Sequence, residues 1–136
     1  EFKNEWIIKP ELNFGKETRF DFLIESGKQK ILLEVKNVTL SRKKRLAEFP
    51  DAVTSRGLKH LNDLIKATEL GYKSYIIYVI QREDCDKFAI AEDIDPEYNK
   101  LLTLAKKKNV KILCYDCKFS TKGIKLNNRL KLQIND

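Results

Sequence analysis

Apolar and polar positions alternate near the start of the chain and predict a β-hairpin. Between residues 19 and 25 every second side chain is apolar, the period expected of a half-buried strand. A turn signal at Ser26-Gly27-Lys28 follows, and residues 30–40 resume an apolar pattern that predicts a second strand. The preceding residues Trp6-Ile7-Ile8 fit either a short strand or the end of a helix.

The pattern changes to helical spacing after a polar, basic connection over residues 41–48. From Asp51 the apolar residues recur at helical intervals, with Asp51 or Thr54 as the candidate cap and Gly71 as the stop. Residues 74–80 are then almost continuously apolar, which predicts a central strand buried on both faces.

A second helix and strand follow in the same order. Asp95-Pro96 places a proline at the favoured first position of a helix, and that helix ends in Lys106-Lys107-Lys108, where cations complement the helix dipole. Residues 110–115 predict another buried strand, and residues 124–134 predict a terminal strand or an extended tail.

These elements together describe a mixed sheet flanked by helices. The helix after Asp51 is long enough to connect two parallel strands. A length of 136 residues fits one domain with a genuine core. We therefore predict a single three-layer α/β/α domain over residues 1–136, with a central mixed β-sheet.

The charge composition favours an anionic partner. Lys and Arg outnumber Asp and Glu by 27 to 20, which gives a net charge of +7 and a pI near 9.3. Nucleic acid is the usual partner of such a chain, although a Lys-rich surface also serves solubility alone. We find no apolar run of membrane-spanning length and no secretory leader pattern, so we expect a cytoplasmic protein without a membrane partner.

Glu34-Val35-Lys36 is the first candidate for chemistry. Residues two apart on a strand project from the same face, so Glu34 and Lys36 point together while Val35 turns the other way. The triplet alone is weak, because chance matches are expected in a chain this rich in Lys and Glu.

Asp21 strengthens this candidate through the register of the predicted hairpin. If the chain turns tightly over Gly27-Lys28, Asp21 lies opposite Glu34, with Cβ atoms roughly 4.5–5.5 Å apart. Two carboxylates so close repel unless a cation separates them or one is protonated, and Mg²⁺ suits such a pair. A three-residue loop would instead shift the register and move Asp21 off that face.

The alternative is that Asp21 and Glu34 are solvated strand residues and that Lys36 simply pairs with one of them. The neighbouring residues argue against it. Apolar side chains flank all three positions, which is not typical of a freely exposed face.

Several motifs, taken in combination, resemble the sugar fermentation stimulation protein A family. They cover nearly the whole chain: Glu11, Arg19-Phe20-Asp21-Phe22, residues 33–40 and 49–54, Arg56-Gly57, His60-Leu61 and Ile94-Asp95-Pro96 with Tyr98. The resemblance implies a restriction-endonuclease-like domain of the PD-(D/E)XK class and DNA binding. Family members usually have an N-terminal OB-like domain, for which we find no counterpart in this sequence.

If the site is active, the charges of the candidate residues imply their roles. Asp21, Glu34 and the backbone carbonyl of Val35 would hold Mg²⁺ or Mn²⁺, with Glu11 as a possible further ligand. The metal would activate water and stabilise charge on the scissile phosphate. Lys36 would orient the water or neutralise the developing oxyanion.

Two groups of cationic residues are predicted to contact nucleic acid. Arg42, Lys43, Lys44 and Arg45 directly follow the Glu34–Lys36 strand and would attract a phosphate backbone, although such runs are often only solvated. Arg56 and His60 are four apart on the predicted helix and would lie on one face beside the metal.

Three functions remain open from the sequence, and the one that the intact Asp21, Glu34 and Lys36 set disfavours is a structural or interaction domain in which the acidic pair is incidental. The first is a DNA-binding protein with a metal-dependent nuclease site, acting as an endonuclease or exonuclease. The second is a non-catalytic nucleic-acid-binding regulator of sugar metabolism genes that retains the nuclease fold. An intact Asp21, Glu34 and Lys36 set does not separate the first two.

Overall fold

The predicted hairpin is confirmed in the computed structural model, which describes residues 6–15 and 18–133. Strand β2 (Thr18–Ser26) pairs antiparallel with β3 (Gln29–Val38) across a two-residue turn, and Ser26 lies opposite Gln29. Gly27 adopts a positive φ of 58°, which a tight hairpin turn favours in glycine. Residues Ile7–Phe14 form strand β1 on the outer edge of β2, so the helical alternative for this segment is excluded.

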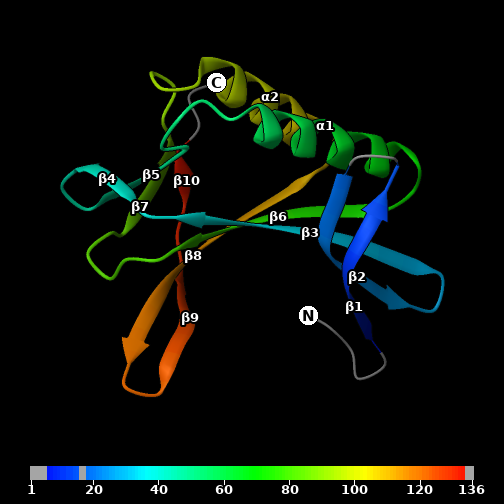
Figure 1. Ribbon diagram of the computed structural model, residues 1–136, viewed down its shortest axis with the longest axis horizontal. Coiled ribbons are helices and arrows are strands. Elements are labelled where there is room, and N and C mark those ends of the chain that lie inside the picture. The colour runs from blue at the N-terminus through cyan, green and yellow to red at the C-terminus, as the bar shows by residue number, and fades with distance from the viewer. Residues whose placement is uncertain (1–5, 16–17, 134–136) are drawn as a thin grey trace.

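The central sheet has six strands in the order β1-β2-β3-β6-β8-β9. The later strands are β6 (Lys73–Ile80), β8 (Lys111–Ser120) and β9 (Gly123–Arg129). Strands β3, β6 and β8 run parallel, and the outer pairs are antiparallel (Figure 1). Helices α1 (Ser55–Glu69) and α2 (Pro96–Lys107) lie in the connections to β6 and β8. The predicted α/β class with a mixed central sheet is confirmed.

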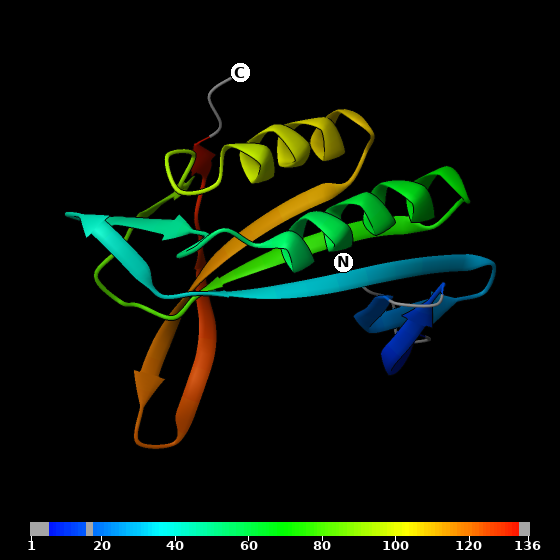
Figure 2. The same cartoon turned by 45° about the horizontal axis from the view of Figure 1, so that its top comes forward.

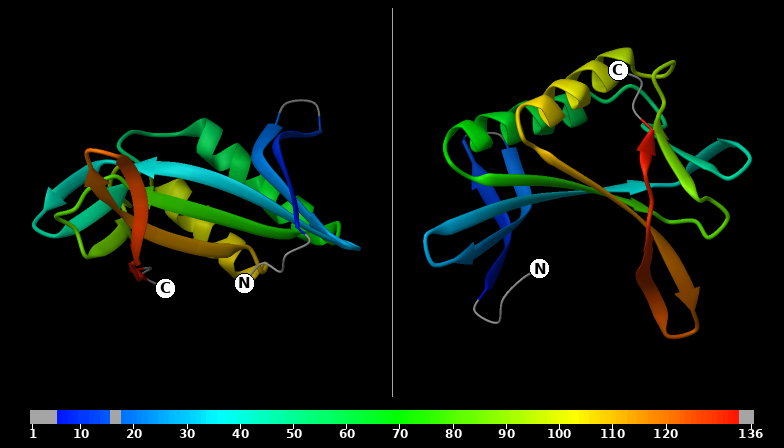
Figure 3. Two further views of the ribbon diagram at one scale, coloured as in Figure 1. Left: turned by 90° about the horizontal axis from the view of Figure 1, so that it is seen from below. Right: turned by 180° about the vertical axis from the view of Figure 1, so that it is seen from behind.

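Both helices lie side by side over one face of the central sheet (Figures 2 and 3). Along β6, Ser74, Ile76, Tyr78 and Ile80 are buried, whereas the residues between them are only partly buried. The prediction that this strand is buried on both faces is therefore wrong, because the helices in the described part of the chain cover a single face. Of the three predicted layers, the described residues form the sheet and one helical layer.

A second, four-stranded sheet corrects the prediction of a loop at residues 41–48. Its strands, in the order β10-β7-β5-β4, are Leu132–Gln133, Lys87–Ile90, Leu46–Phe49 and Leu40–Lys43. Arg45 turns the chain between β4 and β5 with a φ of 67°. The polar composition of this segment reflects ion pairs on the strands, since Arg42 contacts both Glu48 and Asp93 at 2.7 Å. The predicted terminal strand is present as β9 and β10, and residue 134 lies outside the described residues.

Two capping residues, Thr54 and Asp95, fix the starts of α1 and α2. The Thr54 hydroxyl accepts a hydrogen bond from the Gly57 amide at 2.9 Å, so the helix begins at Ser55 rather than at Asp51. Asp95 caps α2 through the Tyr98 amide at 3.1 Å and also accepts a bond from the Thr54 amide at 3.0 Å. Asp95 thereby ties the two helix starts together and holds the first turns of α1 in place.

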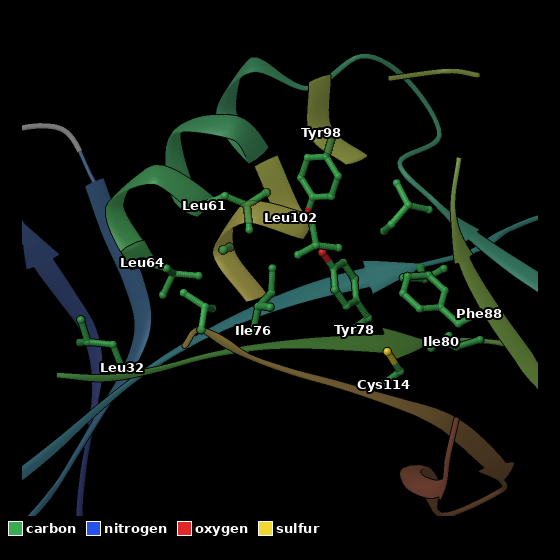
Figure 4. Close-up of a cluster of buried hydrophobic side chains, with 14 of the residues drawn as sticks. Leu32, Leu61, Leu64, Ile76, Tyr78, Ile80, Phe88, Tyr98, Leu102 and Cys114 are labelled. Atoms are coloured by element: carbon green, nitrogen blue, oxygen red, sulfur yellow. The ribbon is translucent and has the colours of Figure 1, made fainter. Parts of the chain in front are cut away.

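The core fills the space between the helices and the central sheet (Figure 4). Leu61 of α1, Leu102 of α2 and Ile76 of β6 are fully buried there. Each such side chain contributes roughly 1.5–3 kcal/mol through burial. The hydroxyls of Tyr78 and Tyr98 also lie in the core and form a hydrogen bond of 2.6 Å, which satisfies two buried polar groups.

No helix in the described part of the chain is long and apolar enough to cross a membrane.

Candidate active site

The acidic pair forms where the β2–β3 ladder ends. The register predicted from the tight turn continues to the pair Phe22 and Leu33, after which the two backbones stop pairing. At the next position an oxygen of the Asp21 carboxylate accepts a hydrogen bond from the Val35 amide at 2.7 Å. Asp21 therefore substitutes for a backbone partner and lies against the Glu34 carboxyl group.

Glu34 is buried and perturbed. Its side chain is 5% exposed, and its Oε2 atom has no hydrogen-bond partner among the described residues. Burial raises the pKa of Glu34 to about 8; the Lys36 charge opposes this rise, and the Asp21 charge and hydrogen bond add to it. The negative charges of Asp21 and Glu34 repel each other when both groups are ionised. A proton on one of them, or a metal ion bound to both, relieves this repulsion.

Lys36 lies on the same face of β3 and contacts both Glu34 and α1. Its Nζ atom is 2.9 Å from His60 Nδ1 and 3.8 Å from Glu34 Oε1. Burial lowers the pKa of Lys36, while the Glu34 charge acts against that lowering. A lysine in this state is suited to exchanging a proton with water held nearby.

His60 is a partner of Lys36. The ring is buried, and burial, followed by the charges of Lys36 and Arg56, lowers the pKa of His60 to about 4. The neutral ring has a free nitrogen lone pair that accepts a hydrogen bond from the Lys36 ammonium. Sequence placed His60 correctly on one helix face with Arg56, but the contact with Lys36 depends on how α1 packs across β3.

Glu11 lies opposite Asp21 on β1, between the paired positions of Pro10 and Leu12. Its φ is 55°, and its carboxylate is exposed and lies 3.7 Å from Arg19. In the part of the chain that the structure describes, no group of three or more His, Cys, Asp or Glu side chains is arranged to hold a metal ion. A metal at Asp21 and Glu34 would therefore complete its shell with the Val35 carbonyl, water and substrate oxygens.

The four consecutive basic residues 42–45 lie beyond the far end of β3, away from the β2–β3 turn (Figure 1). Arg42 contacts Glu48 and Asp93, and Arg45 contacts Asp86 at 2.6 Å. These two arginines stabilise the small sheet, and Lys43 and Lys44 lie exposed at its tip.

Arg19 and Lys59 were not predicted as site residues, although Arg19 belongs to one of the motifs, and both line a hollow beside Arg56 and His60. A signal for Arg19 was available, because it precedes Asp21 by two positions on the same strand and so shares its face. Lys59 adjoins His60 in sequence, but its place in the hollow depends on the packing of α1.

Glu34→Gln is expected to stabilise the metal-free protein at high pH. The folded state binds the Glu34 proton more tightly than the unfolded state, in which the pKa is near its ordinary 4.5. The stability of the natural protein should therefore fall as pH rises from about 4.5 to about 8. Urea unfolding in EDTA should show the variant more stable by about 2–4 kcal/mol at pH 8 and nearly equal at pH 4.5.

The matched control is Glu69→Gln, which replaces an exposed carboxylate on α1. This substitution should change the free energy of unfolding by the same small amount at both pH values. An equal gain for Glu34→Gln at pH 4.5 and pH 8 would contradict the raised pKa.

The fold and the residues at the end of the β2–β3 ladder define a domain of the restriction-endonuclease-like α/β class. The chain belongs to the sugar fermentation stimulation protein family, since residues 1–123 match the family described as "Sugar fermentation stimulation protein RE domain".

Relatives named as sugar fermentation stimulation protein homologues agree with this assignment. The protein from Pelagibacter ubique (strain HTCC1062) is 54% identical over 132 residues, which cover 97% of this chain and 57% of that protein. The protein from Ruegeria sp. (strain TM1040) is 42% identical, with 90% of this chain and 53% of that protein covered. The chain thus spans just over half the length of these relatives.

A solved structure has the same fold. The structure of Pyrococcus furiosus SfsA in complex with Ca²⁺ superposes with a TM-score of 0.86 at 30% identity. The match covers 96% of this chain and 57% of that chain.

Proposed function

We propose that this domain is a divalent-metal-dependent nuclease that acts on nucleic acid in the cytoplasm, with DNA as the first candidate substrate. Asp21 and Glu34 hold the metal, and Lys36 acts on the attacking water. The observation that supports this most directly is Glu34 itself: a buried carboxyl group whose Oε2 atom has no hydrogen-bond partner among the described residues, close to a second carboxyl group and to a lysine.

The chemistry of these groups fits Mg²⁺ or Mn²⁺. Both carboxylates are hard oxygen ligands, and no soft thiolate lies among them. Metal binding would release the proton that Glu34 otherwise keeps and would satisfy its unpaired Oε2. The related Pyrococcus furiosus SfsA was solved with Ca²⁺, an ion with the same preference for oxygen ligands.

The protein's own residues divide the remaining work. The bound metal would supply a Lewis acid for the phosphate and for water. Asp21 is held by the Val35 amide, so its second oxygen keeps a fixed position beside Glu34. Lys36, held by His60, can donate a hydrogen bond to the attacking water or receive its proton. The hydrolysed P–O bond leaves one phosphate end and one hydroxyl end.

The proposal is tested by incubating the protein with circular DNA, linear duplex DNA, single-stranded DNA and RNA. Each substrate is tested with Mg²⁺, with Mn²⁺, with Ca²⁺ and with EDTA. We expect at least one substrate to be cleaved with Mg²⁺ or Mn²⁺ and none with EDTA. Binding without cleavage of any substrate would favour the non-catalytic regulator instead, and absence of binding would contradict both functions.

A further inference from the structure

A hollow of about 620 Å³ adjoins the acidic pair, between β2 and the start of α1. Its lining side chains are those of Arg19, Ser55, Arg56, Lys59 and His60. His60 joins the hollow to the candidate active site, because the same ring contacts Lys36. Any group bound in the hollow would therefore lie next to the proposed reaction centre.

The lining of this hollow is cationic. Arg19, Arg56 and Lys59 contribute three positively charged side chains, and no carboxylate is among the lining residues in the described part of the chain. The charge of Arg56 acts on Glu34, Lys36 and His60, which shows that it is close to the site. The first turn of α1 contains no acidic residue, so the positive end of the helix dipole adds to this field.

Three other arginines of the chain differ from this group. Arg42, Arg45 and Arg82 each form an ion pair of 2.6–2.7 Å with an aspartate, and their charge is compensated within the fold. Arg19 has a looser contact, 3.7 Å from the exposed Glu11 carboxylate and 3.4 Å from the Asn13 amide oxygen. An incoming anion competes more easily with such a contact than with a close bidentate pair.

We propose that this hollow binds a second phosphate group of the substrate, adjacent to the phosphodiester that is cleaved. Arg19 and Arg56 contact the phosphate from opposite walls, β2 and α1, and Lys59 is a third cation. The inference rests on the proposed nuclease function. The bound group is either a terminal phosphate or an internal phosphodiester, which present the same charged oxygens to the two arginines.

The first test measures phosphate binding without chemistry. Inorganic phosphate is titrated in EDTA while the arginine side-chain Nε–Hε signals are followed by NMR. We expect the signals of Arg19 and Arg56 to shift and that of the paired Arg45 to stay. The double variant Arg19→Gln/Arg56→Gln should weaken phosphate affinity by about tenfold or more.

Lys28→Gln is the matched control, because it removes one exposed cation at the distant β2–β3 turn. It should change phosphate affinity less than about twofold. An equal loss in the control, or no loss in the double variant, would overturn the proposed subsite.

The second test distinguishes the two sources of phosphate. Cleavage is compared on 5′-phosphorylated linear, 5′-hydroxyl linear and circular DNA with Mg²⁺ or Mn²⁺. A preference for 5′-phosphate that disappears in Arg56→Gln supports a terminal phosphate, and an equal loss on linear and circular DNA supports an internal one. If Arg56→Gln leaves the cleavage rate unchanged on every substrate that is cleaved, the proposed subsite is overturned.

The two proposals fail in different ways. If no substrate is cleaved but Arg19 and Arg56 still bind phosphate in EDTA, the nuclease function is contradicted and the anion site stands. If cleavage occurs and phosphate does not perturb either arginine, the subsite alone is contradicted.

Discussion

Lys36→Ala is expected to reduce metal-dependent cleavage by about 10²–10⁴-fold, the usual contribution of a positioned general acid or base. The side chain is 15% exposed and contacts both Glu34 and His60, so its ammonium group is held beside the acidic pair. Initial rates on the best-cleaved substrate, measured at saturating metal, give the comparison.

Two variants control this measurement. Lys28→Ala removes a lysine from the turn of the same hairpin and should leave the rate unchanged within about twofold. Asp21→Asn keeps an acceptor for the Val35 amide but removes the charge, and it should reduce the rate through loss of metal. Cleavage that persists in both Lys36→Ala and Asp21→Asn would show that the chemistry lies elsewhere.

Metal affinity is expected to rise about tenfold from pH 6 to pH 7 and about fiftyfold in all from pH 6 to pH 8. The pKa of Glu34 is about 8 without metal, so below that pH the metal must displace a proton to bind. Lowering the pH therefore weakens binding, and the dependence should flatten above pH 8. Calorimetric titration with Mn²⁺ in two buffers of different ionisation enthalpy should show about one proton released per ion at pH 7.

Glu34→Gln cannot release this proton. The variant should bind Mn²⁺ weakly, with little dependence on pH in this range. A pH-independent affinity in the natural protein would contradict the coupling between metal binding and the Glu34 proton.

The features that depend on residues close together in the sequence, the hairpin register and the cap of α1, could be predicted from the sequence. The two-residue turn at Gly27-Lys28 fixes the hairpin register, and this local register alone places Asp21 near Glu34. The sequence offers Asp51 and Thr54 as candidate caps for α1. Thr54 is the cap, because its hydroxyl accepts a hydrogen bond from the amide three residues ahead.

Long-range packing explains what the sequence did not predict. The polar sequence of residues 41–48 predicts a loop, whereas the structure forms strands there, because the charges of Arg42 and Arg45 are satisfied by Asp93 and Asp86, more than forty residues away in sequence. The contact between His60 and Lys36 joins a helix to a strand across 24 positions, and no periodic pattern encodes it. The exposure of alternate β6 residues likewise depends on which face the helices cover.

The hydrogen bond from the Val35 amide to Asp21 has a consequence for how relatives are judged. Because that carboxylate closes the hairpin ladder, a descendant that abandoned catalysis would still need an acceptor at this position to keep its sheet intact. An aspartate at this position is therefore weak evidence that a relative has the proposed activity. Lys36 is better evidence for the proposed activity, since burial of its ammonium group beside a protonatable glutamate is costly, and a relative without that activity is expected to lose this lysine before the aspartate.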